Sequence, residues 1–130
     1  ILSVLGISSF RTALIKARDS TRKSDLATIA KSLEAYINDH RSYPNANSDG
    51  TIVCTPTACP WGSAFSDGNT LYTAKLPSDP SGFSYRYTKS GTGYILYARL
   101  ENTQDPALIP DPGVTCGTAP CNYKIQSSNL

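Results

Sequence analysis

The first third of this chain lacks a helix-breaking residue and carries a helical repeat of apolar side chains. No proline precedes Pro44, and apolar residues recur at steps of three and four through Leu26, Ile29 and Leu33. Such steps place the side chains on one face of an α-helix. Proline disfavours a helical conformation in the residue before it, so the predicted helix covers residues 1–43.

The predicted helix is too long to lie entirely within a domain of this size. At 1.5 Å per residue, residues 1–40 span about 60 Å, which exceeds the diameter of a compact chain of 130 residues. One end must therefore project. Residues 1–7 are mostly apolar on all sides, whereas the later turns are amphipathic. We expect residues 1–16 to project into lipid or an assembly, and residues 17–43 to pack on the rest of the chain.

Gly6 is the weakest point of the predicted helix. Glycine costs about 1 kcal/mol relative to alanine in a helix interior. The hydroxyls of Ser8 and Ser9 can also compete for backbone hydrogen bonds. The sequence therefore favours a short non-helical stretch within residues 1–9, with regular helix from Phe10, and a continuous helix is the alternative.

Charge changes abruptly along this segment. Residues 1–10 carry none, whereas residues 11–41 carry seven of the twelve bases and four of the ten acids. A basic collar beside an apolar tip is typical of a membrane boundary, and a solvated helix face is the alternative. The small net charge of +2 excludes a histone-like electrostatic binder of nucleic acid.

Four cysteines form two local pairs with the same spacing. Four residues separate Cys54 from Cys59, and four separate Cys116 from Cys121. An even number of cysteines in a small chain favours disulfides and an oxidising compartment, with a four-cysteine zinc site as the alternative. Short loops close easily, so the expected bonds are Cys54–Cys59 and Cys116–Cys121.

Residues 44–130 predict a small head built on β-structure. Loop signals fill residues 44–82. The alternation of FSYRY and the run YILYARL, separated by KSGTG, predict a β-hairpin with a long turn over residues 83–100. Residues 101–130 contain the second cysteine pair and a last strand at NYKIQS. The predicted fold class is α+β, a long N-terminal helix packed on a small antiparallel sheet.

Two segments resemble bacterial type IV pilins and pseudopilins. Residues 17–44, ARDSTRKSDLATIAKSLEAYINDHRSYP, carry the charged collar, the leucine and isoleucine stripe and the terminal YP typical of the pilin helix. Residues 76–102 resemble the sheet of the major pseudopilins of type II secretion. The resemblance implies a lollipop-shaped subunit that is held in the inner membrane and then packs helix-inward into a filament. It also implies that further apolar residues precede Ile1.

On this resemblance, we expect a structural subunit of an extracellular type IV pilus-like filament of identical subunits, assembled by the pilus machinery. One alternative is a major pseudopilin of a type II secretion system. Another is a minor or tip pilin that binds a surface or DNA.

Two sets of residues would carry the assembly. The apolar set would pack between helices and consists of Ile1, Leu2, Val4, Leu5, Gly6, Ile7, Phe10 and Leu14. The charged set would form salt bridges between subunits and consists of Arg18, Asp19, Arg22, Lys23 and Asp25.

The sequence offers no catalytic constellation. His40 is the single histidine, and no nucleophile or positioned acid accompanies it. No phosphate-binding glycine motif occurs, so we expect neither an enzyme nor a cofactor. Major pseudopilins usually bind calcium in the loop after the hairpin, where Asp105 and Asp111 lie. The family spacing is absent, and we expect the Cys116–Cys121 ring to hold this loop instead of a metal.

Overall fold

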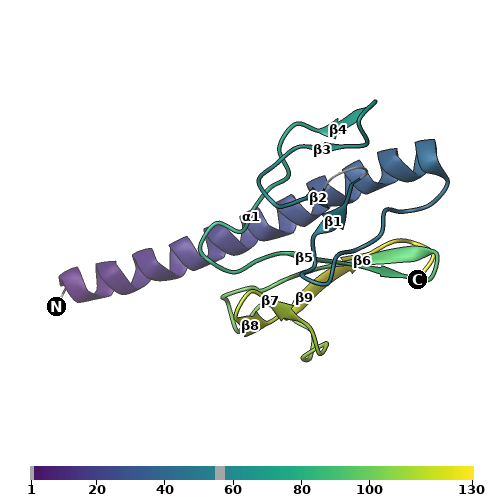
Figure 1. Cartoon of the computed structure of the whole chain (residues 1–130). Coiled ribbons are helices and arrows are strands. Elements are labelled where there is room, and N and C mark those ends of the chain that lie inside the picture. The colour runs from purple at the N-terminus through teal and green to yellow at the C-terminus, as the bar shows by residue number, and fades with distance from the viewer. Residues whose placement is uncertain (1, 55–57) are drawn as a thin grey trace.

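The chain begins with one long helix that extends well beyond the head. The computed structural model describes residues 2–54 and 58–130 (Figure 1). Helix α1 spans Leu2–His40, a length of 39 residues, and its second half lies along the β-structure. This arrangement confirms the α+β class and the long N-terminal helix on a small antiparallel sheet.

Helix α1 runs through Gly6 without interruption. The single subunit thus has the continuous helix given as the alternative, while a break within residues 1–9 of the assembled filament stays a prediction; Ile1 lies outside the described residues. A break would create two new helix ends with unpaired backbone groups, which costs more than the glycine penalty of about 1 kcal/mol. The hydroxyl of Thr12 donates to the carbonyl of Ser8 at 3.1 Å, so the local side chains bond to the helix itself.

Helix α1 ends with a left-handed residue. Arg41 has a φ of 63°, and its N–H donates to the carbonyl of Ile37 at 2.7 Å. This geometry satisfies one of the last free carbonyls and turns the chain out of the helix axis. Pro44 follows three residues later, in agreement with the predicted end of the helix.

The main sheet has three antiparallel strands in the order β5-β6-β9. They are β5, Arg86–Ser90; β6, Gly93–Ala98; and β9, Tyr123–Gln126. Ser90 pairs with Gly93, so only two residues form the hairpin turn, and the long turn predicted there is wrong. Gly91 makes the tight turn possible, because its φ of 58° is readily adopted by glycine. The last predicted strand is present as β9.

Short two-stranded ribbons occupy the loops around this sheet. Ribbon β1-β2 and ribbon β3-β4 lie in the region predicted as loop, and ribbon β7-β8 follows the hairpin. Their bounds are β1, Ile52–Val53; β2, Ala58–Cys59; β3, Phe65–Ser66; β4, Leu71–Thr73; β7, Thr115–Cys116; and β8, Ala119–Pro120. Each pairs too few residues to show a sequence period, which explains why the pattern predicts only loop.

The core lies between the second half of α1 and the sheet. Leu26, Ile29 and Leu33 of the helix are fully buried there, as the apolar repeat predicts. Tyr85 and Tyr87 are fully buried as well, because each finds a polar partner for its hydroxyl. Tyr87 donates to the carbonyl of Pro44 at 2.6 Å, and Tyr85 donates to the Asp25 carboxylate.

Candidate functional site

The first third of α1 presents large apolar side chains to solvent. Val4 is 68% exposed, Ile7 62%, Phe10 64% and Leu14 40%. Their spacing of three, three and four residues places them on one side of the helix. Figure 1 shows that this part of α1 extends away from every strand. A row of exposed apolar side chains on a projecting element indicates a surface that another molecule covers.

This projecting surface contains the apolar assembly residues predicted from the sequence. The four exposed side chains all belong to that set. Gly6 lies among them, and nothing would come within 4 Å of a Cβ atom at this position. Ile1 and the side chains of Leu2 and Leu5 lie outside what the structure describes.

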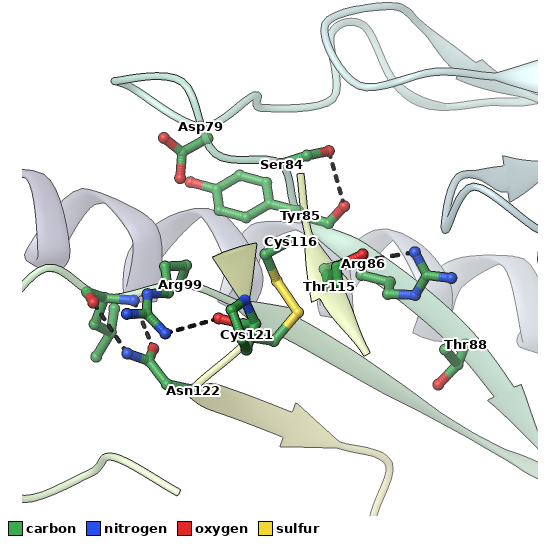
Figure 2. Close-up of a disulfide and its surroundings, with 12 residues drawn as sticks. Asp79, Ser84, Tyr85, Arg86, Thr88, Arg99, Thr115, Cys116, Cys121 and Asn122 are labelled. Carbon is green, nitrogen blue, oxygen red and sulfur yellow. Dashed lines mark hydrogen bonds between the residues drawn. A yellow bond between two sulfur atoms is a disulfide. The ribbon is translucent and has the colours of Figure 1, made fainter. Parts of the chain in front are cut away.

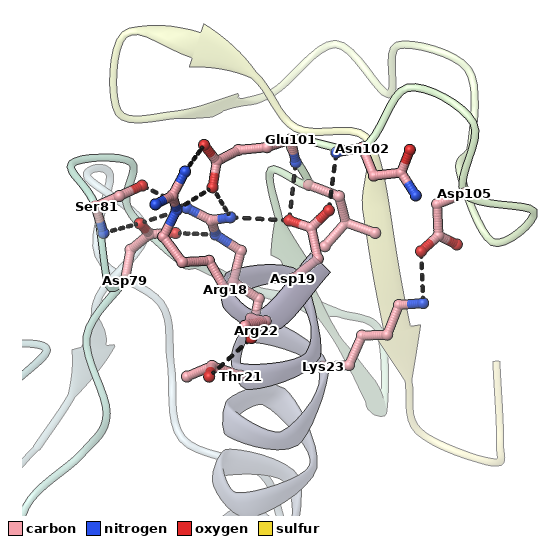
Figure 3. A network of polar contacts seen from close by, with 12 residues as sticks. Arg18, Asp19, Thr21, Arg22, Lys23, Asp79, Ser81, Glu101, Asn102 and Asp105 are labelled. Atoms are coloured by element: carbon pink, nitrogen blue, oxygen red, sulfur yellow. Dashed lines mark hydrogen bonds and ion pairs between the residues drawn. The ribbon is translucent and has the colours of Figure 1, made fainter. Parts of the chain in front are cut away.

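Arg22 anchors the helix to the head. Its side chain is fully buried and donates five hydrogen bonds (Figure 3). Nε and Nη2 form a fork on the Asp79 carboxylate at 2.7 and 3.0 Å, and Nη2 also bonds to Ser81 Oγ at 2.6 Å. Nη1 reaches Asp19 at 2.8 Å and Glu101 at 2.7 Å. Buried charges need this kind of full pairing, and the guanidinium fork supplies it.

Asp19 and Arg18 extend this network to the segment after β6. The Asp19 carboxylate accepts hydrogen bonds from the backbone N–H groups of Glu101 and Asn102 at 2.9 and 2.8 Å. Arg18 forms its own fork on Glu101, at 2.7 and 2.8 Å. One turn of α1 therefore fixes the start of the long loop that follows the hairpin.

The network holds its members in their charged forms. Hydrogen bonds from Arg18, and then from Arg22, lower the pKa of Glu101 to about 2. Burial opposes ionisation of Asp79, but the hydrogen bonds from Arg22 outweigh it and lower the pKa of that carboxyl. Burial likewise opposes the charge on Arg22, yet its carboxylate partners raise its pKa above the ordinary arginine value.

Two further charged residues of α1 also bind within the subunit. Lys23 Nζ lies 2.7 Å from an oxygen of Asp105. Asp25 accepts a hydrogen bond of 2.5 Å from the Tyr85 hydroxyl, and burial raises the pKa of this carboxyl. All five residues of the predicted charged set thus have partners in their own head.

Salt bridges between subunits from the charged set stay a prediction, because the single subunit shows only the partners within its own head. Arg22 and Asp19 are buried within the single subunit, where they bind each other and the segments around Asp79 and Glu101. The sequence shows the charges on the helix but not their partners. Asp79 lies 57 residues and Glu101 lies 79 residues from Arg22 along the chain, and no local spacing connects them.

The residues considered for metal or catalytic roles have structural partners. Asp105 binds Lys23 and accepts from the Ala107 N–H at 2.8 Å, and Asp111 accepts from the Gly113 N–H at 2.8 Å. His40 Nε2 lies 2.8 Å from Asp67 at the end of α1. Within residues 2–54 and 58–130, no three His, Cys, Asp or Glu side chains form a group that could hold a metal ion.

Both cysteine pairs form the predicted local disulfides. The bonds are Cys54–Cys59 and Cys116–Cys121. Figure 2 shows the second disulfide beside Asn122 and Arg99. Arg99 donates to the carbonyl of Pro120 at 2.9 Å, so the ring is tied to the end of the main hairpin.

Comparison with known proteins identifies the family. The family described as type II secretion system (T2SS), protein G matches residues 10–98. The type II secretion system core protein G of Pseudomonas aeruginosa is 32% identical over 94 residues, which cover 71% of this chain and 64% of that protein. The chain thus spans just under two thirds of this relative. No solved structure matches the chain.

The matched region contains most of the features described above. It begins at Phe10 in the projecting surface and includes the charged turn of α1, Asp79 and both strands of the main hairpin. Across the described residues, no helix has an apolar stretch long enough to cross a membrane. From its match over more than half of its length, this chain belongs to the family of type II secretion system protein G.

Proposed function

We propose that this chain is the repeating structural subunit of a type II secretion pseudopilus. The observation that carries the proposal is the projecting surface of α1, with Val4, Ile7, Phe10 and Leu14 exposed on one side. In a filament of identical subunits these side chains would bury against neighbouring helices. The heads would then lie outside a core of packed helices.

The same surface accounts for two environments of one subunit. Apolar side chains are stable in lipid before assembly and between helices after it, so the exchange costs little. An assembly machine in the inner membrane could therefore drive subunits into a periplasmic filament. In this proposal the subunit belongs to the secretion apparatus, and the family match does not support the extracellular pilus expected from the sequence.

The family match supports the pseudopilin alternative, and it gives no support to a tip pilin that binds a surface or DNA. The role of the subunit is mechanical rather than catalytic in this proposal. The buried Arg22 network suits that role, because it holds the head in a fixed orientation on the helix that would pack in the filament.

Two matched substitutions test the proposal. Phe10→Asp places a charge in the projecting surface, and Leu71→Asp places one on strand β4 of the head. The two side chains are similarly exposed, at 64% and 61%, so neither change should alter folding. With each variant expressed in full length from the native locus, we expect Phe10→Asp to abolish filament formation and secretion. Leu71→Asp should retain both.

The result that would contradict the proposal is equal secretion and equal filament yield for the two variants. The thermal unfolding midpoints of the two purified full-length variants provide the control. They must agree with that of the unmodified protein for the comparison to report on assembly.

A further inference from the structure

The loop between strands β6 and β9, residues 99–122, is long and holds only the short ribbon β7-β8. Its start is bound to α1 through Glu101 and Asn102, whose backbone N–H groups donate to Asp19. A loop of this length needs further attachment to keep one conformation, since each free residue retains backbone entropy. Lys23 and the Cys116–Cys121 disulfide supply this attachment.

Lys23 connects three parts of the subunit at the middle of this loop. It leaves helix α1, and its Nζ lies 2.7 Å from the Asp105 carboxylate in the loop (Figure 3). The same Nζ lies 5.8 Å from the ring centroid of Tyr123 on strand β9. A cation over an aromatic face is attracted to it, so one ammonium joins the helix, the loop and the sheet. The Asp105 side chain of this pair is only 10% exposed.

Several oxygen atoms that a divalent cation would need here already have partners, including both carboxylate oxygens of Asp105. Asp105 accepts from Lys23 with one oxygen and from the Ala107 N–H with the other. Asp111 accepts from the Gly113 N–H, and Asn102 Oδ1 accepts from the Gln104 N–H. Calcium takes six to eight oxygen ligands, and a fixed ammonium at the carboxylate repels it. The residues present do not fit the calcium site implied by the family resemblance.

The far end of the loop is closed covalently. The Cys116–Cys121 disulfide joins the two sides of ribbon β7-β8, and the Cys121 N–H donates to Val114 at 3.0 Å. Asn122 bonds to both backbone groups of Leu100, accepting at 2.7 Å and donating at 3.0 Å. The loop therefore returns to its own starting point without an ion.

We propose that Lys23 is the built-in cation of this loop, and that with the Cys116–Cys121 disulfide it fastens the loop without calcium. The ammonium neutralises the Asp105 carboxylate as a metal ion would, and the disulfide cross-links the loop as shared metal ligands would. The subunit is thus calcium-independent. This inference concerns the single subunit and does not rest on the proposed assembly.

The first test measures calcium on the unmodified protein. Thermal unfolding and amide hydrogen exchange are recorded in millimolar calcium chloride and in excess EGTA. We expect the same midpoint and the same exchange in residues 99–122 under both conditions. A higher midpoint or slower loop exchange in calcium would overturn the proposal.

The second test removes the built-in cation. Lys23→Ala is compared with Lys31→Ala, since Lys31 is exposed on the same helix and has no ion pair within the described parts of the chain. We expect about fivefold faster exchange in the loop for Lys23→Ala only, in calcium and in EGTA alike. Unchanged exchange for Lys23→Ala would overturn the role of Lys23. If Lys23→Ala does not fold, Lys23→Arg keeps the charge and should retain slow exchange.

Discussion

Arg22 is the residue on which the placement of the helix depends most. Its guanidinium is buried and shared by three carboxylates that come from the helix and from two separate loops. Removing one partner of a buried network leaves the other charges uncompensated, which costs much more than losing a surface pair.

We therefore expect Arg22→Ala to lower the free energy of unfolding by about 3–5 kcal/mol. The free energy of unfolding of Arg22→Lys should lie between those of the unmodified protein and Arg22→Ala, because lysine keeps the charge and loses the fork on Asp79. Arg11→Ala, on the projecting part of the helix, is the control and should be neutral. Urea unfolding of the three variants measures the effect. A loss below about 1 kcal/mol for Arg22→Ala would contradict the network as described.

The carboxylate of Glu101 makes the subunit sensitive to acid. Its folded pKa of about 2 lies below the ordinary glutamate value of about 4.3. The ionised side chain therefore contributes its full share to the free energy of unfolding at pH values above about 4.3. The contribution is lost as the pH falls from about 5 to about 2, because protonation removes the pairing with Arg18 and Arg22.

Glu101→Gln should accordingly lower the free energy of unfolding at pH 7 by on the order of 2 kcal/mol. The difference from the unmodified protein should shrink as the pH approaches 2. Urea unfolding of both proteins between pH 2 and pH 7 measures how this difference in the free energy of unfolding changes with pH. A difference that stays constant with pH would assign the effect of the substitution to packing rather than to charge.

Among the elements, the long helix and the disulfide rings are the parts that the sequence predicts best. Both are local: a three- and four-residue repeat defines the helix face, and four intervening residues define each ring. The hairpin is predicted as an element but not in its turn, because Gly91 allows two residues to suffice. The charge network is not predicted, since its partners meet only after the chain has folded.

The ring formed by Cys116 and Cys121 stabilises an element too short to hold itself. Ribbon β7-β8 pairs only two residues on each side, and both cysteines are fully buried. Replacing the two cysteines together by serine should lower the free energy of unfolding by about 2 kcal/mol, as expected for a small closed loop. Thermal unfolding of the double variant, compared with the unmodified protein under oxidising conditions, measures this loss. Equal midpoints would contradict a stabilising role.

Over the whole molecule, the two ends of helix α1 have different roles: the second half packs in the core of the head, and the first part projects from it. The second half of α1 belongs to the core of the head, where Leu26, Ile29 and Leu33 are buried. The first part presents Val4, Ile7 and Phe10 to solvent and contributes nothing to that core. The charged turn around Arg22 lies between the two and fixes the angle at which the helix leaves the head (Figures 1 and 3).

A cryo-electron microscopy structure of the assembled filament would show directly whether the projecting surface of α1 holds the subunits together. We expect a core of packed helices in which Val4, Ile7 and Phe10 contact neighbouring copies, while Leu71 and the Arg22 network keep their places in each head. A filament held together by contacts between heads, with the projecting surface of α1 still exposed to solvent, would contradict this expectation.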